Sequence, residues 1–170
     1  MKNGYYNGKY YISASMLAQI MYDKEQVLDR WFKRKPLVRT EQMKQGEAWH
    51  EKLGYTNKVL YSRELVLDDG TVVVLFGIPD CCDYGLEELK TVEDYVSSKK
   101  LNSARVQVLV YLYLLDLDVG RLVFVSRKTG EIVYCEDVKR DDERLKKIVE
   151  EFIYLIEGWK TYMALHGLEG

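Results

Sequence analysis

Two acidic residues and a lysine stand close together in the segment GIPDCCDYGLEELKT, which runs from Gly77 to Thr91. Asp80 closely follows an uncharged stretch, Val72 to Ile78, and Glu88 and Lys90 are two positions apart. Residues two apart on a β-strand point to the same face. A carboxylate that faces another carboxylate and an ammonium is unfavourable unless a cation lies between the acids. Magnesium fits that position because it binds one or two carboxylates and leaves its other sites to water and phosphate.

The same charges also fit a simpler structure, an edge hairpin whose polar face is in contact with water. For any one of these residues alone, this is the preferred interpretation. The pattern of all three together favours a metal site at the end of one strand and on its neighbour.

Apolar periodicity predicts the elements that must position these side chains. Ser13 or Ser15 can cap a helix that closes at Pro36, and Thr40 can cap a second one. A helix from Asn102 or Ser103 is apolar on almost all sides, so we expect it to lie buried against a sheet. An amphipathic helix closes the chain over 141–166. Strands are predicted over 58–67, 71–84 and 86–91, as a meander, and over 121–126 and 131–136. The fold class is α/β, a central mixed sheet flanked by helices.

Length and composition set the broad class of the protein. A chain of 170 residues with 47% hydrophobic content predicts one domain over 1–170. No apolar run approaches a membrane span, and the first residues lack a signal-peptide pattern, so we expect a cytoplasmic protein without a membrane partner. The net charge of −2 does not indicate a nucleic-acid binder as a whole, so such a partner must be held by local patches.

The residues of the opening segment resemble the motif of the PD-(D/E)XK nuclease superfamily, here Pro79-Asp80 followed by Glu88-Leu89-Lys90. The RecB-like branch, which includes recombination exonucleases and CRISPR-adaptation nucleases, is similar at four places in the same order. These are G-x-x-x-H at Gly46 to His50, G-x-x-D at Gly77 to Asp80, E-x-K-T at Glu88 to Thr91 and Q-x-x-x-Y at Gln107 to Tyr111. The resemblance runs from about Ser13 to Tyr113.

This resemblance implies a restriction-endonuclease-like core and a Mg²⁺- or Mn²⁺-dependent nuclease whose substrate is DNA. The implied metal ligands are His50, Asp80, Glu88 and the backbone carbonyl of Leu89, and the imidazole favours manganese. Lys90 would orient and help deprotonate the attacking water or stabilise charge on the phosphate. Gln107 and Tyr111 would complete the catalytic set, bordering the site and helping to hold Lys90 or the DNA backbone. The expected activity is exonucleolytic, on single-stranded or linear DNA ends, with 5′-phosphate and 3′-hydroxyl products.

Several of these residues also have purely structural interpretations. Taken alone, His50 would be interpreted as a structural helix histidine beside Trp49. The Gln107 side chain can equally form a hydrogen bond with a neighbouring loop, and the Tyr111 hydroxyl can equally reach solvent. Glu64 is a possible accessory ligand, but a cross-strand partner for Lys or Arg is preferred. Trp31 can be a core residue, with its lysine neighbours forming a solvated helix end. The predicted DNA contacts are Arg30, Trp31, Lys33, Arg34, Lys99, Lys100 and Arg105, with Arg105 the favoured phosphate contact.

Cysteine usage separates the chain from many CRISPR-adaptation nucleases. Those relatives bind an iron–sulfur cluster through one early and three late cysteines, whereas this chain has only Cys81, Cys82 and Cys135. We therefore expect no cluster, and the cysteines are interpreted as small hydrophobic residues. Two alternatives to the exonuclease remain: a catalytically silent DNA-binding or scaffolding subunit of the same fold, and a structure-selective endonuclease. Protein partners or homo-oligomers are compatible with each, as are roles in DNA repair, viral replication or spacer acquisition.

Overall fold

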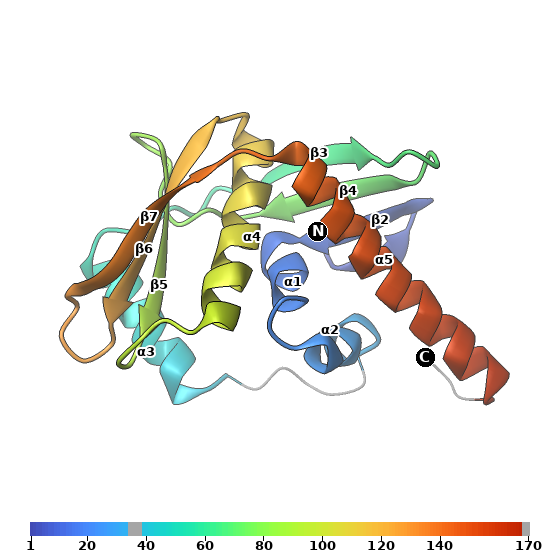
Figure 1. The fold of residues 1–170 in the computed structure, drawn as a ribbon, viewed down its shortest axis with the longest axis horizontal. Coiled ribbons are helices and arrows are strands. Elements are labelled where there is room, and N and C mark those ends of the chain that lie inside the picture. Colours follow the sequence, from blue (N-terminus) through green and yellow to red (C-terminus); the bar gives the residue numbers. More distant parts are fainter. Residues whose placement is uncertain (34–38, 168–170) are drawn as a thin grey trace.

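A computed structural model of the chain describes residues 1–33 and 39–167, which form two β-sheets with helices between and beside them (Figure 1). The strands are β1 (Gly4–Tyr6), β2 (Lys9–Ser13), β3 (Tyr61–Val66), β4 (Val72–Gly77), β5 (Leu86–Val92), β6 (Val119–Ser126) and β7 (Ile132–Lys139). The helices are α1 (Ala14–Gln19), α2 (Lys24–Trp31), α3 (Glu41–Lys52), α4 (Ser98–Leu115) and α5 (Asp142–Leu165). No helix of these described ranges is long and apolar enough to cross a membrane.

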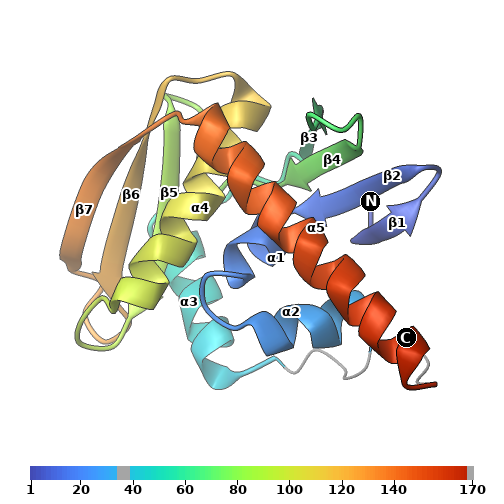
Figure 2. The same ribbon diagram turned by 45° about the vertical axis from the view of Figure 1, so that its right-hand side comes forward.

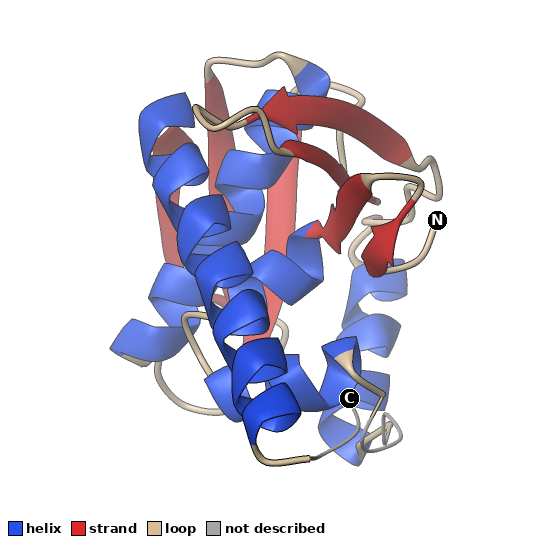
Figure 3. Cartoon of the chain, turned by 90° about the vertical axis from the view of Figure 1, so that its right-hand side faces the viewer, coloured by secondary structure: helices blue, strands red, loops and turns tan. Residues whose placement is uncertain are grey.

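Both sheets are mixed. The first has the order β1-β2-β4-β3, with β2 and β4 parallel and the other pairs antiparallel. The second has the order β5-β6-β7, with β5 and β6 parallel and β6 and β7 antiparallel. Helix α4 lies between the sheets and contacts strands of both, and α5 crosses in front of it (Figures 2 and 3). The expected α/β class is therefore confirmed, with the strands divided between two sheets.

Helix α4 is buried because its sequence is apolar on nearly every side. Ten of its residues are buried, among them Val106, Val110 and Leu112, which have no exposed surface. The helix begins four to five residues before the predicted start, because the Ser97 hydroxyl accepts a hydrogen bond from the backbone N–H of Lys100 at 3.2 Å. The buried helix carries Gln107 and Tyr111 into the space between the two sheets.

Two predictions about the first half of the chain are wrong in detail. The helix expected from Ser13 to Pro36 is divided, because the Asp23 side chain caps a new helix through the N–H of Gln26 at 3.1 Å. The hairpin β1–β2 was not predicted, although its Asn7-Gly8 turn, with φ of 54° and 73°, is typical of a tight hairpin. The predicted caps Ser13 and Thr40 are confirmed.

The predicted meander is also wrong, because β5 does not pair with β4. The chain leaves the first sheet at residues 78–85, a loop with Pro79, which has no N–H, and Gly85 at a φ of 121°. Strand β5 then pairs in parallel with β6 in the second sheet. It is largely buried on both faces, which is typical of a parallel strand covered on two sides. The loop and β5 hold the charged residues of the candidate site.

Candidate active site

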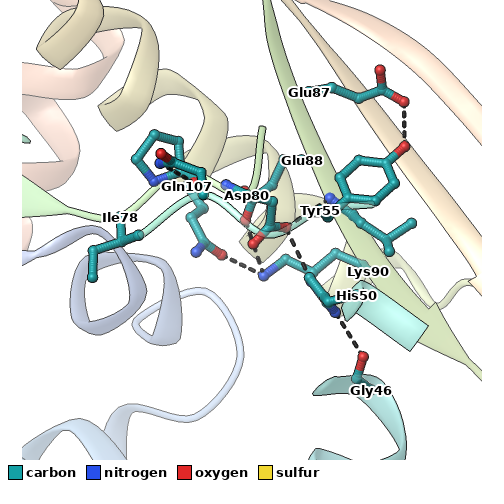
Figure 4. A network of polar contacts seen from close by, with 12 residues as sticks. Gly46, His50, Tyr55, Ile78, Asp80, Glu87, Glu88, Lys90 and Gln107 are labelled. Atoms are coloured by element: carbon teal, nitrogen blue, oxygen red, sulfur yellow. Dashed lines mark hydrogen bonds and ion pairs between the residues drawn. The ribbon is translucent and has the colours of Figure 1, made fainter. Parts of the chain in front are cut away.

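The structure brings together side chains from two helices, one strand and a loop in a single polar network (Figure 4). Asp80 lies in the loop after β4, Glu88 and Lys90 lie on β5, and His50 lies on α3. Gln107 joins from the buried helix α4. These residues come from segments far apart in the sequence, and they meet where β4 ends beside β5.

Two hydrogen bonds fix Asp80 against β5. Its carboxylate Oδ2 accepts from the N–H of Leu89 at 2.9 Å, and its own N–H donates to Oε1 of Glu88 at 3.1 Å. Burial opposes ionisation of Asp80, but the hydrogen bond with His50 and the charge of Lys90 outweigh it and lower the pKa of the carboxyl. Asp80 is therefore held as a carboxylate directly beside a second acidic group.

Glu88 is an acidic side chain with only 1% of its surface exposed. Burial raises its pKa to about 8; the charge of Lys90 opposes the rise, and the neighbouring Asp80 adds to it. The amine of Lys90 lies 3.5 Å from Oε2 of Glu88, so one ammonium serves two adjacent carboxyl groups. Such a pair of acids is short of positive charge, and a divalent cation would supply it.

His50 bridges the helix α3 and the acidic pair. Its Nδ1 lies 2.7 Å from the carbonyl oxygen of Gly46, and a carbonyl only accepts, so Nδ1 carries the hydrogen. The other nitrogen, Nε2, lies 3.1 Å from Oδ2 of Asp80. Burial lowers the pKa of His50, but the hydrogen bond and charge of Asp80 outweigh this, and the net direction is upward. In its neutral form the ring keeps its hydrogen on Nδ1, so Nε2 has a free lone pair beside Asp80 that could bind a metal ion.

Lys90 is held by a chain of hydrogen bonds that ends on the Asp80 loop. Its amine donates to Oε1 of Gln107 at 2.6 Å, the Gln107 amide donates to the Tyr111 hydroxyl at 3.1 Å, and that hydroxyl donates to the carbonyl of Ile78 at 3.2 Å. Burial raises the pKa of Tyr111, so the hydroxyl keeps its proton and remains a donor. The spacing of four residues on α4 thus connects Lys90 to the loop that carries Asp80.

Two glycines allow the elements to approach closely. A Cβ at Gly46 would lie 3.1 Å from Oγ1 of Thr91, so the glycine lets α3 pack against β5. A Cβ at Gly77 would lie 2.9 Å from the Tyr111 ring, so the end of β4 can reach α4 only with a glycine there. These contacts give a physical reason for the glycines of the first two motifs.

Asn57 also supports the site, and the sequence analysis did not identify it. Its side-chain amide donates to the carbonyl of Pro79 at 2.8 Å, and its backbone N–H donates to the carbonyl of Asp80 at 3.2 Å. The segment that holds Asn57 forms neither helix nor strand and has no periodicity that could have marked the residue. Asn57 therefore fixes the backbone of the Asp80 loop through two hydrogen bonds.

The donor set suits an open metal site. Within residues 1–33 and 39–167, no three His, Cys, Asp or Glu side chains group closely enough to enclose a metal. Magnesium needs only one or two carboxylates, with water and substrate oxygens completing its octahedron. These residues therefore fit a magnesium or manganese ion that shares its coordination with a substrate.

Cavities lie on both sides of the network. One of about 700 Å³ is bordered by His50 and Asp80, with the lysines Lys44 and Lys58 on its wall. A second, of about 330 Å³, is bordered by Lys90, with Lys100 beside it. A larger cavity of about 920 Å³ lies between α5 and the first two helices and holds none of the predicted catalytic residues. The network is thus reachable from two directions, and both approaches carry lysines.

The predicted DNA contacts are only partly exposed to a ligand. Trp31, for which both a DNA contact and a core role were considered, is partly buried and packs against the core, with its ring 5.4 Å from that of Phe152. Arg105, the favoured phosphate contact, instead forms two hydrogen bonds with Glu136, at 2.6 and 3.0 Å.

The remaining basic residues differ in their surroundings. Arg30 is partly buried, and burial lowers its pKa. Lys33 and Lys99 are exposed, Lys100 borders the cavity beside Lys90, and Arg34 lies outside the described residues. Glu64 forms an ion pair with Lys9 of β2, which lies two strands away in the same sheet, so Glu64 has a cationic partner, as the sequence analysis preferred.

No protein-family model matches the chain, and no curated protein matches it. Solved structures share its fold at low sequence identity. The alkaline exonuclease LHK-Exo of Laribacter hongkongensis has a TM-score of 0.53 at 15% identity, over 94% of this chain and 93% of that one. A phage-related exonuclease from Haemophilus somnus 129PT has a TM-score of 0.62 at 12% identity, over 93% and 97%. The protein SSO0001 has a TM-score of 0.62 at 18% identity, over 89% and 79%. The chain therefore has a fold that is also found in solved exonucleases.

Proposed function

We propose that this protein is a metal-dependent deoxyribonuclease of the RecB-like PD-(D/E)XK type, and that it acts as an exonuclease on single-stranded or linear DNA ends. The observation that carries the proposal is the fully buried Glu88 beside Asp80, with the amine of Lys90 at 3.5 Å. A purely structural ion pair does not require a second buried acid. The fold shared with solved exonucleases supports the proposal, as does a structure of LHK-Exo in complex with dAMP.

Asp80, Glu88 and His50 would hold a Mg²⁺ or Mn²⁺ ion, together with the carbonyl of Leu89, after at least one of the three side chains moved toward the ion, because they are not grouped closely enough to enclose it in the geometry described above. When bound, the metal lowers the pKa of water and neutralises charge on the phosphate. Leu89 already ties the strand to Asp80 through its N–H, so the ligands on β5 and on the loop are fixed relative to one another.

Lys90 would act on the phosphate or on the attacking water. One N–H of its amine is used by Gln107 and another faces Glu88, and an ammonium has three hydrogens to donate. The remaining hydrogen is available to a phosphate oxygen or to water. Gln107 and Tyr111 are positioning residues in this arrangement, because they contact Lys90 and the Asp80 loop and are themselves buried.

The first experiment is digestion of end-labelled linear and circular single-stranded DNA by the purified protein. Reactions contain no metal, magnesium or manganese, and the variants Asp80→Asn and Lys90→Ala are compared with the parent. Glu64→Gln is a matched control, because this exposed acid is paired with Lys9 on a strand edge. We expect metal-dependent loss of linear DNA in the parent and the control, and no digestion by the two site variants.

Each other outcome supports a different function. Cutting of circular DNA would indicate an endonuclease. Absence of cutting on either substrate, or variants as active as the parent, would refute the catalytic role of the network. DNA binding without cutting would then favour a silent binding subunit.

A further inference from the structure

The cavity that Lys90 borders is formed by segments far apart in the sequence. It has a volume of about 330 Å³ and lies between the end of α1, the turn that follows it, α3 and the first half of α4. Its lining includes Gln19, Tyr22, Gln26, Met43, Lys90 and Lys100, and it is named the Lys90 pocket. Binding sites for small molecules commonly have volumes of about 300–1,000 Å³. The Lys90 pocket is therefore suited to one small group of a substrate.

The charges of the Lys90 pocket suit an anion. Lys90 and Lys100 both line it, and none of the described residues in its lining is acidic. The cavity on the other side of the network differs, because Glu47, Glu51 and Asp80 line it together with two lysines. A phosphate group is therefore attracted more strongly to the Lys90 pocket than to the opposite cavity.

Two exposed apolar side chains also face the Lys90 pocket. Tyr22 and Met43 come from distant segments, and each is 44% exposed. Single exposed apolar residues are common on protein surfaces, but here two of them meet in one cavity that also holds two ammonium groups. An aromatic ring can stack on any unpaired base, and a thioether adapts to the edge of a planar ring. The pocket thus combines a surface for a flat ring with charges for a phosphate.

A pair of amides completes the polar part of the lining. The Gln19 amide donates to Oε1 of Gln26 at 2.7 Å. A primary amide has two N–H hydrogens and an acceptor oxygen, so the pair keeps both donors and an acceptor after this bond is made. The edge of an unpaired base carries the same kinds of group, whereas in a duplex these groups are used by the opposite base. The amide pair therefore favours a base that has no partner.

We propose that the Lys90 pocket binds one unpaired nucleobase of the substrate strand, stacked on Tyr22, with the adjoining phosphate at Lys90 and Lys100. The proposal rests on the nuclease function proposed above and identifies a residue that selects single-stranded substrate. Tyr22 is a specificity-determining residue in this arrangement, because it contacts the base and not the reacting phosphate. Stacking requires the ring and not the hydroxyl, so phenylalanine should replace tyrosine without loss.

Binding of a short single-stranded oligonucleotide, with calcium as the only divalent cation, tests the base site. The strand is compared with copies that carry one abasic nucleotide, at each position in turn. For the parent, Kd should rise about tenfold when one particular base is missing. Tyr22→Ala should bind the intact strand about tenfold more weakly and lose nothing further when that base is removed, because both changes remove the same contact. Tyr22→Phe should match the parent.

Tyr154→Ala is the matched control, because Tyr154 is an 83% exposed tyrosine on α5 that lines a different cavity. Circular dichroism of each variant verifies folding. Additive losses, a strand in which no single base matters, or a parent that does not bind the strand would overturn the base site. Digestion with magnesium or manganese separates the two proposals: digestion without coupling refutes only the base site, and coupling without digestion refutes only the nuclease function.

Discussion

Glu88→Gln tests whether the buried Glu88 carboxyl carries a proton in the folded protein near neutral pH. Burial raises the pKa of this group from 4.5 to about 8, so the folded state binds more protons than the unfolded chain between these pH values. Stability that depends on this proton is complete below the unfolded pKa and is lost as the pH rises through the folded pKa. Each tenfold difference in proton affinity is worth about 1.4 kcal/mol, so ionisation of the fully buried group destabilises the folded state by on the order of 4 kcal/mol.

The assay is urea unfolding of the parent and of Glu88→Gln in the presence of a chelator, at about pH 5 and about pH 8. Glutamine keeps an acceptor for the Asp80 N–H but cannot ionise. The free energy of unfolding of the variant should therefore not depend on ionisation at position 88. Between the two pH values, the free energy of unfolding of the parent should fall by several kcal/mol more than that of the variant. His50 also makes the free energy of unfolding depend on pH, but it does so in both proteins, so its effect largely cancels when the variant is subtracted from the parent. Manganese should reduce the difference, because a bound cation stabilises the ionised carboxylate.

A difference between parent and variant that is constant from pH 5 to pH 8 would refute this reasoning. It would mean that Glu88 is ionised throughout, and that Lys90 alone balances both acids. The argument that the acidic pair is short of positive charge would then fail. The digestion experiment is independent of this outcome.

Three further predictions concern residues that position the site. Gln107→Met should lower kcat about tenfold to a hundredfold in steady-state digestion without unfolding the protein, because the amine of Lys90 loses a hydrogen bond; an unchanged kcat would exclude this role. Gly77→Ala should lower the free energy of unfolding by about 1–3 kcal/mol, because the added methyl meets a buried ring. Gly158→Ala, with open space around it on α5, should instead be neutral or stabilising, and equal losses in the two variants would contradict the steric argument. Asn57→Ala should weaken manganese binding in titration calorimetry at unchanged secondary structure; parent-like affinity would show that the Asp80 loop needs no such support.

Local spacing was sufficient to predict the parts of the site that lie on one element. Glu88 and Lys90 are two residues apart on a strand, and their side chains meet at 3.5 Å. Gln107 and Tyr111 are four residues apart on a helix, and they form a hydrogen bond. The fold class and the caps at Ser13 and Thr40 also followed from local patterns. These features depend on the period of the backbone, which is the same in every protein.

The relation between elements was decided only by the tertiary structure. The sequence suggested that Asp80 and Glu88 lie on paired neighbouring strands, but their strands belong to different sheets and a loop brings the residues together. Trp31, predicted either as a DNA contact or as a core residue, packs on α5, and Arg105, predicted as a phosphate contact, has a partner on β7 that the sequence did not predict. Such partners come from residues far along the chain, and apolar packing and ion pairing do not depend on sequence distance. The sequence by itself therefore determined which side chains share a face, and the packing of α3, α4 and the two sheets determined which faces meet.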